Sequence, residues 1–145
     1  MRFVVTGGAG FVGSHLVQLL IKNNHEVIVI DNLHTGKKEN LESVIDKIEF
    51  QKIDIRNYES MENILKNIDG VFHQAALTVV QDSFSNPKEY YDVNVQGTEN
   101  IFKLSIENKF KVVYASSSSV YGHKQKMPIE ENMETKPINP YGQTK

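Results

Sequence analysis

The sequence predicts an α/β fold in which a doubly wound parallel sheet has the strand order 3-2-1-4-5. Short β-branched runs alternate with segments of helical periodicity, as they do in chains that build a parallel sheet with crossover helices. A glycine-rich turn at residues 7–13 joins the first run to the first helical segment. We expect the ligand crevice between the first and fourth strands, where the strand order reverses.

The first half of the chain contains three predicted strands. Residues 3–6 form the first strand, and apolar residues at helical spacing then predict a helix that ends near Asn23 and Asn24. Residues 26–30 are almost all aliphatic, as expected for a strand that is covered on both faces. Residues 50–53 are the third predicted strand.

A helix and a short strand are expected in the middle of the chain. Apolar residues at helical spacing predict an amphipathic helix over residues 61–68, closed by Asp69 and Gly70. The fourth strand is expected at residues 71–74. A helix between two such strands is typical of a parallel sheet with crossover helices.

The second half ends on a fifth strand and a long loop. A helix is predicted over residues 87–108, with small residues on one face that permit close packing, and the fifth strand over 111–116. Residues 123–140 contain three prolines and no clear periodicity, so we expect a loop whose polar run at 123–126 is solvated. The standard fold has at least a sixth strand, and we expect this chain to be truncated before it.

Composition indicates one compact domain with enough apolar residues, 39%, for a core. A net charge of −2 gives no electrostatic case for binding nucleic acid or an anionic membrane. Without cysteine, and with five histidines that lack ligand spacing, we predict no metal site. No apolar run approaches the roughly 20 residues of a membrane helix, and the N-terminus does not read as a signal peptide, so we expect a cytoplasmic protein.

The glycine-rich turn carries the pattern of a dinucleotide site. Gly-x-Gly-x-x-Gly is present at Gly8, Gly10 and Gly13, and Gly-x-x-Gly-x-x-Gly begins at Gly7. Glycines permit a tight turn and close approach of the backbone to a pyrophosphate, while the following helix offers amides and a positive dipole to the anion. The alternative is a turn that binds nothing, but the flanking strand and helix favour the cofactor.

An acidic residue, Asp31, ends the second predicted strand, 18 residues after Gly13. A carboxylate there accepts hydrogen bonds from ribose hydroxyls and repels a 2′-phosphate, which favours NAD over NADP. Asp54, after the third strand, is placed to bond the adenine amino group, with Ile55 against the ring. A helix N-cap or turn aspartate is an equally good interpretation of Asp54.

Two hydroxyl-bearing motifs lie in the last third of the chain. A run of four serines at 116–119 follows the fifth predicted strand, whose end faces the crevice, although alone it is best interpreted as a polar turn. Tyr141 and Lys145 form a Tyr-x-x-x-Lys pair on one helical face. The unperturbed pKa of tyrosine is about 10, and a nearby lysine favours the phenolate, so the pair suits a general base in nicotinamide-linked redox chemistry.

The chain resembles the N-terminal half of an extended short-chain dehydrogenase/reductase of the NAD-dependent epimerase/dehydratase family. The matching motifs, spread over the whole sequence, are the glycine loop, Asp31-Asn32-Leu33, Asp54-Ile55, His73-Gln74-Ala75-Ala76, Asn94-Val95-Gln96-Gly97-Thr98, residues 114–122 and residues 139–145. The resemblance implies a Rossmann-type NAD(P)-binding domain over residues 1–145, without the family's C-terminal substrate domain.

The resemblance also implies which residues act. Its catalytic residues are Ser117, Tyr141 and Lys145. Its cofactor-binding residues are Gly7, Gly10, Phe11, Val12, Gly13, Asp31, Asn32, Asp54, Ile55, Ala75, Ala76, Leu77, Asn94, Tyr141 and Lys145. His73, at the end of the fourth predicted strand, is expected to be a hydrogen-bonded wall residue rather than a catalyst.

The activity implied by the resemblance is that of an NAD-dependent nucleotide-sugar 4-epimerase of the UDP-glucose/UDP-galactose type, a homodimer when full length. Tyr141 would take the proton of the sugar 4-hydroxyl while Ser117 bonds the same oxygen, and the reaction would pass through a 4-keto sugar. The serine run favours an epimerase over a 4,6-dehydratase. Uronate-type 4-epimerases carry a similar serine run, and Thr78 stands where galactose-type enzymes often have lysine. The alternatives are a UDP-uronate or N-acetylhexosamine 4-epimerase, a nucleotide-sugar 4,6-dehydratase and a non-catalytic NAD-binding module.

The position of Lys145 as the last residue carries two expectations. A helix from Tyr141 to Lys145 is shorter than the ~12–15 residues that isolated helices need, so residues 138–145 are expected to be poorly ordered or held by a neighbouring chain. We also expect the 145-residue chain alone to be catalytically silent, while cofactor binding by residues 7–98 partly survives.

Overall fold

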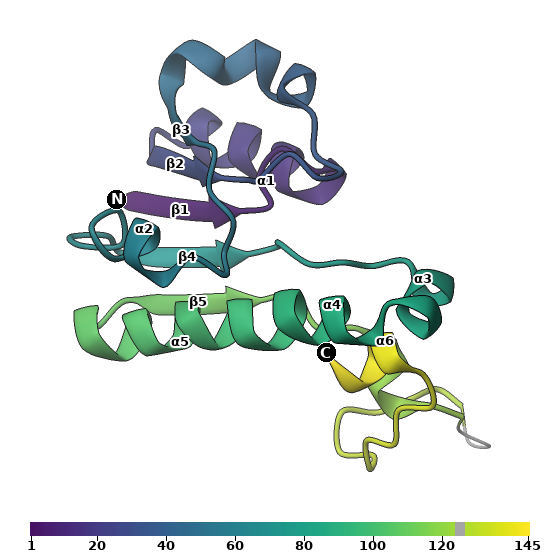
Figure 1. Cartoon of the computed structure of the whole chain (residues 1–145). Coiled ribbons are helices and arrows are strands. Elements are labelled where there is room, and N and C mark those ends of the chain that lie inside the picture. Colours follow the sequence, from purple (N-terminus) through teal and green to yellow (C-terminus); the bar gives the residue numbers. More distant parts are fainter. Residues whose placement is uncertain (124–126) are drawn as a thin grey trace.

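The computed structural model describes residues 1–123 and 127–145, arranged around a five-stranded sheet in which all neighbouring strands are parallel (Figure 1). The order β3-β2-β1-β4-β5 is the predicted one. The strands are β1 (Arg2–Thr6), β2 (Glu26–Ile30), β3 (Ile48–Gln51), β4 (Gly70–His73) and β5 (Lys111–Tyr114).

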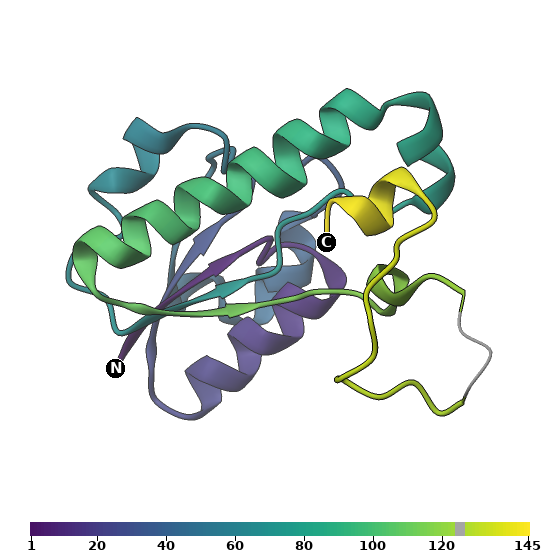
Figure 2. The ribbon, with the colours of Figure 1, turned by 90° about the horizontal axis from the view of Figure 1, so that it is seen from below.

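Two apolar cores lie on the two faces of this sheet. Successive side chains of a strand point to opposite faces, so the neighbours Val4 and Val5, both fully buried in β1, belong to different cores. The Val5 core is covered by the α-helix α1 (Phe11–Lys22) and the 3₁₀-helix η1 (Lys38–Lys47). Figure 2 views the sheet from its edge, with helices on both of its faces.

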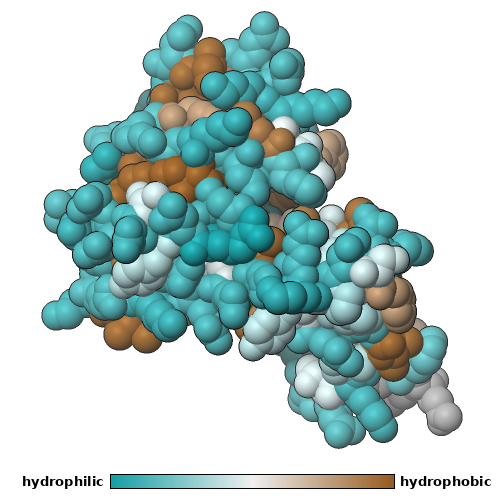
Figure 3. Space-filling model, viewed as in Figure 1, coloured by the Kyte–Doolittle hydropathy of each residue, from teal (hydrophilic) through white to brown (hydrophobic). Residues whose placement is uncertain are grey.

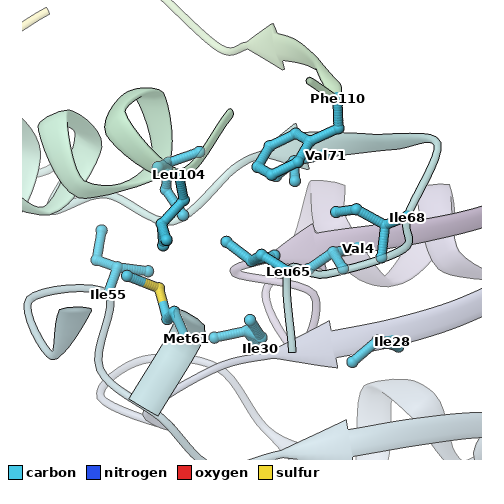
Figure 4. Packing of buried hydrophobic residues seen from close by; sticks show 11 residues of the cluster. Val4, Ile28, Ile30, Ile55, Met61, Leu65, Ile68, Val71, Leu104 and Phe110 are labelled. Atoms are coloured by element: carbon cyan, nitrogen blue, oxygen red, sulfur yellow. The ribbon is translucent and has the colours of Figure 1, made fainter. Parts of the chain in front are cut away.

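The Val4 core lies under two other helices, α2 (Tyr58–Glu62) and α5 (Gly97–Asn108). Figure 4 shows Met61 and Leu104 pointing from these helices toward the strands. Met61 and Leu104 are fully buried, and burying a side chain of this size contributes about 1.5–3 kcal/mol. Both faces of the central strands are therefore covered, which explains their aliphatic sequences.

The predicted helix over 87–108 is confirmed, but it contains a change of winding. It begins as α4 (Pro87–Tyr91), passes through a π-helical segment η2 (Asp92–Gln96) and continues as α5 (Figure 2). A Cβ at Gly97 would lie 2.7 Å from the Ile55 side chain, so glycine permits this close approach.

The helix predicted over 61–68 is wrong in its bounds. Asn57 caps the N-terminus of α2 by accepting a hydrogen bond from the Ser60 amide at 3.1 Å, and the helix is assigned only to Glu62. The chain then turns through Asn67, which has a positive φ of 57°. Leu65 and Ile68 are still buried in the core, although they lie after the end of α2. Their helical spacing therefore indicates burial and not a helix.

Other differences concern element ends and short helices. β3 begins at Ile48 rather than at residue 50, and β4 and β5 each end before the predicted residue. Among the described residues, three helices were not predicted: η1, α3 (Val80–Ser85) and η3 (Ser118–Tyr121). The helix α6 (Pro140–Gln143) lies where a helix from Tyr141 to Lys145 was expected. In the predicted loop, 127–139 contains no helix or strand, and residues 124–126 of the predicted solvated run lie outside the described residues.

Hydrophilic residues cover most of the face shown in Figure 3. In the described part of the chain, no helix is both long enough and apolar enough to cross a membrane.

Candidate active site

A cleft of about 380 Å³ lies at the carboxyl ends of the strands, where parallel sheets of this topology bind ligands. It brings together fourteen of the residues predicted for the site. These are Gly7, Gly10, Phe11, Val12, Gly13, Asp31, Asn32, Asp54, Ile55, Ala75, Ala76, Leu77, Tyr141 and Lys145. Residues that sequence reasoning did not assign to the site also line it, among them Arg56, Val93 and Ser116.

The glycine loop packs so closely that side chains are excluded from it. Gly7 has a positive φ of 66°, and a Cβ there would lie 2.7 Å from the Ala75 amide nitrogen. A Cβ at Gly13 would overlap the Gly7 carbonyl oxygen. The helix α1 then starts at Phe11 without a side-chain cap, and its first residues line the cleft. Such a cradle fits a pyrophosphate.

Asp31 lies at the rim of the cleft and is only 7% exposed. Its two carboxylate oxygens accept hydrogen bonds from the amides of Ala9, at 3.0 Å, and Leu33, at 2.8 Å. A Cβ at Gly36 would lie 2.9 Å from both oxygens, so the loop closes tightly around the carboxylate. Backbone bonds thus fix an anionic acceptor beside the glycine loop.

Asp54 is a turn aspartate at the cleft. It lines the cleft, and its Oδ1 accepts the Arg56 amide at 2.9 Å, as a turn aspartate does. The Arg56 guanidinium donates to both carboxylate oxygens, at 2.9 and 2.7 Å, and Asn32 donates to Oδ2 at 2.9 Å. The hydrogen bond from Arg56 is the largest cause that holds the pKa of Asp54 well below its usual range. This carboxylate therefore stays ionised.

Asn94, predicted to contact the cofactor, does not line the cleft, whereas its neighbour Val93 does. Asn94 is 2% exposed and holds two segments together. Its Oδ1 accepts the Leu77 amide at 2.8 Å, and its Nδ2 donates to the Leu77 carbonyl at 2.9 Å and to Thr144 Oγ1 at 3.0 Å. Asn94 thus ties a wall of the cleft to the end of α6.

Tyr141 and Lys145 meet in this cleft on and just after α6. Tyr141 is 8% exposed. Burial lowers the pKa of the Lys145 ammonium to about 8. The cleft therefore holds a phenol and a partly desolvated cation beside the glycine loop, as the Tyr-x-x-x-Lys spacing predicts.

Ser117 does not line the cleft, while Ser116 does. The Ser117 hydroxyl caps η3, where it accepts a hydrogen bond from the Ser119 amide at 3.2 Å. Ser116 donates to the Lys145 carbonyl at 3.4 Å. Both hydroxyls thus lie near the end of β5, but the cleft brings only Ser116 together with the Tyr-Lys pair.

His73 is buried and hydrogen-bonded, as expected, but it does not line the cleft. Its ring is 1% exposed and lies between two hydroxyls, with Nδ1 2.6 Å from Thr6 Oγ1 and Nε2 2.9 Å from Thr98 Oγ1. Burial, and secondarily the charge of Lys145, lower its pKa to about 4. Among the described residues, no group of three or more potential ligands is placed to hold a metal ion.

The expectation that residues 138–145 are poorly ordered is wrong. Asn139 caps α6 by accepting the Gly142 amide at 2.7 Å, and α6 packs against α3 and α4 (Figures 1 and 2). The fully buried Ser83 of α3 accepts the Tyr141 amide at 3.1 Å. Tertiary bonds replace the length that an isolated helix needs.

Replacement of Ser83 by alanine is expected to lower the free energy of unfolding by about 1–3 kcal/mol, because the buried Tyr141 amide loses its acceptor. Urea denaturation of the Ser83→Ala chain measures this. Ser85→Ala, at an exposed serine of the same helix, is the matched control. Equal stability of the two variants would mean that the Ser83 bond does not hold α6.

The comparisons with known proteins agree with this geometry. Residues 3–145 match the sequence profile of the NAD dependent epimerase/dehydratase family. The UDP-glucose 4-epimerase of Halalkalibacterium halodurans is 40% identical over 148 residues, which cover 100% of this chain and 43% of that protein.

Two solved structures have the same fold. The UDP-N-acetylglucosamine 4-epimerase of Methanobrevibacter ruminantium M1, in complex with UDP-N-acetylmuramic acid, has a TM-score of 0.94 at 39% identity, covering 99% of this chain and 46% of that one. The UDP-glucose 4-epimerase of Stenotrophomonas maltophila, with bound NAD and formylated UDP-arabinopyranose, has a TM-score of 0.93 at 32% identity, covering 99% and 45%. This chain spans less than half the length of these relatives. It belongs to the NAD dependent epimerase/dehydratase family.

Proposed function

We propose that this chain is the cofactor-binding part of an NAD-dependent nucleotide-sugar 4-epimerase. The proposal rests mainly on one observation: Tyr141, Lys145 and the glycine loop line the same cleft. A module that only binds NAD has no need of the Tyr-Lys pair. The relatives named above are 4-epimerases of UDP-sugars, which supports the same reaction class here.

The residues divide the work of holding the cofactor. The α1 amides and the glycine loop receive the pyrophosphate, Asp31 accepts from the adenosine ribose, and Asp54 with Ile55 faces the adenine. When bound, NAD supplies the acceptor and donor of hydride for the sugar carbon. Residues 1–145 form one cofactor domain, and the sugar nucleotide is held largely by a substrate half like that of the longer relatives.

Tyr141 and Lys145 carry out the acid-base catalysis. Tyr141 removes the proton of the sugar 4-hydroxyl and later returns it, while the positive charge of Lys145 favours the phenolate. A serine hydroxyl bonds the same sugar oxygen. The family resemblance assigns this role to Ser117, whereas the lining of the cleft favours Ser116.

UDP-glucose and UDP-galactose are the proposed substrates, in a homodimeric cytoplasmic enzyme. A UDP-N-acetylhexosamine is the second candidate, because the Methanobrevibacter neighbour acts on UDP-N-acetylglucosamine. Mixing the enzyme that carries this chain with each UDP-sugar and NAD, and separating the 4-epimers, tests both. Conversion of neither substrate, by a folded enzyme that binds NAD, would overturn the proposal.

NAD⁺ is expected to bind more tightly than NADP⁺, because the Asp31 carboxylate repels a 2′-phosphate. Asp31→Asn should weaken NAD⁺ binding by about 1–3 kcal/mol, since bonds to a charged acceptor are the strong ones, and should narrow the difference between the cofactors. Calorimetric titration of both cofactors measures this, with the exposed Asp46→Asn as control. Tighter NADP⁺ binding by the wild type would contradict the assignment of Asp31.

A further inference from the structure

Lys145 is a half-buried cation with an unusual environment. It lines both the main cleft and a second, smaller hollow. Within residues 1–123 and 127–145, the ammonium has no hydrogen bond or ion pair, and its close partner is an aromatic ring. Nζ lies 4.6 Å from the centre of the Tyr114 ring. This distance is within the range in which a ring face attracts a cation.

Tyr114 is itself held firmly at the end of β5. Its ring stacks on the buried His73 ring, with centroids 5.8 Å apart and planes 26° apart. The Phe102 ring of α5 meets it edge to face at 6.2 Å. These two contacts fix the position of the Tyr114 ring independently of Lys145.

No charged group near the Lys145 ammonium takes the place of the Tyr114 ring as its partner among the described residues. His73 beneath the Tyr114 ring has its pKa lowered to about 4, so it is neutral at physiological pH. Tyr141 shares the main cleft with Lys145, and Glu99 of α5 lines the smaller hollow, but neither forms an ion pair with Nζ among the described residues. Burial alone lowers the pKa of Lys145, and a ring face opposes that effect because it stabilises the charged form.

We propose that Tyr114 is a positioning residue, whose ring face holds the Lys145 ammonium charged and directed along the wall of the cleft beside Tyr141. This inference rests on the proposed function, because that function gives Lys145 its role beside Tyr141. It predicts that the strength of the ring's negative face, and not the Tyr114 hydroxyl, sets the charge of the lysine.

The test titrates Lys145 itself in an enzyme that carries this chain with a complete substrate half. Reductive methylation with ¹³C-formaldehyde gives each lysine an NMR signal, and the Lys145→Arg chain identifies the signal of Lys145. Tyr114→Phe keeps the ring and should leave the pKa within a few tenths of a unit. Tyr114→Leu removes the ring face and should lower the pKa by about half a unit to one and a half units.

A nearly isosteric change keeps the test decisive if the leucine variant does not fold. 3,4,5-Trifluorophenylalanine at position 114 preserves the ring's packing but withdraws its negative face, so the pKa should fall relative to Tyr114→Phe. The same residue at the exposed Phe84 is the control and should change nothing. Equal Lys145 pKa values for the fluorinated and unfluorinated rings would overturn the inference, whatever the enzyme's activity. A titration as expected in an enzyme that converts no UDP-sugar would instead count against the proposed function.

Discussion

Tyr141→Phe is expected to reduce turnover by at least about 10²-fold in an enzyme that carries this chain with a complete substrate half, while NAD⁺ binding stays largely intact. The change removes only the hydroxyl that exchanges a proton with the sugar, and a general base typically contributes 10²–10⁴-fold. The main-chain bond from Tyr141 to Ser83 is unaffected, so α6 should keep its position. Initial rates of UDP-glucose and UDP-galactose interconversion, with calorimetric titration of NAD⁺, measure both effects.

Tyr91→Phe, at an exposed tyrosine of α4, is the matched control and should retain full activity. Near-normal interconversion by Tyr141→Phe would show that the proton leaves by another route. Parallel assays of Ser116→Ala and Ser117→Ala decide which hydroxyl bonds the sugar oxygen. The larger loss of turnover identifies it, and the loss should be smaller than that of Tyr141→Phe if the hydroxyl only orients the substrate.

The sheet was predictable because two-sided burial leaves a plain record in the sequence. Four consecutive residues of β2, from Val27 to Ile30, are at most 3% exposed, so each of them is aliphatic. The glycine loop was predictable for a related reason. The close approaches at Gly7 and Gly13 leave no room for another residue type, so geometry and sequence pattern coincide.

The element bounds were less predictable where packing outweighs local preference. In the edge strand β3, Ile48 and Phe50 alternate with polar residues, and this weak signal placed the strand two residues late. Leu65 and Ile68 have the spacing of a helix but reach the core from turns after Glu62. Periodicity records which residues are buried, and it does not determine the backbone that buries them.

The residues that hold the site residues in place could not be predicted from the local sequence. Ser83 meets Tyr141 across 58 residues of sequence, and a serine in a short helix is otherwise unremarkable. Arg56 fixes Asp54 through a turn whose hydrogen bonds are visible only in three dimensions. Asn94 was found by family resemblance, but its observed role is to bond Leu77 and Thr144. Residues that contact a ligand carry a motif, whereas residues that hold them depend on the tertiary structure.

Acidification is expected to destabilise the fold through His73. Its pKa of about 4 in the folded chain lies below the value of 6.5 of an unperturbed histidine, because the buried ring resists protonation. Above pH 6.5 the ring is neutral in both states and its stabilising effect is complete. As the pH falls from 6.5 to 4, His73 becomes protonated in the unfolded chain but stays neutral in the folded chain. The free energy of unfolding therefore falls by about 3 kcal/mol.

Urea denaturation at pH 7, 5.5 and 4.5 measures this loss, with His73→Gln as the comparison. Glutamine keeps a donor and an acceptor for the hydroxyls of Thr6 and Thr98 but takes up no proton in this range. The variant should be less stable than the wild type at pH 7 because its packing is poorer, yet its stability should fall less steeply with acid. The depressed pKa of Asp54 places that carboxylate's titration below this range. Parallel acid dependences of the two chains would mean that His73 is readily protonated in the folded chain despite its burial.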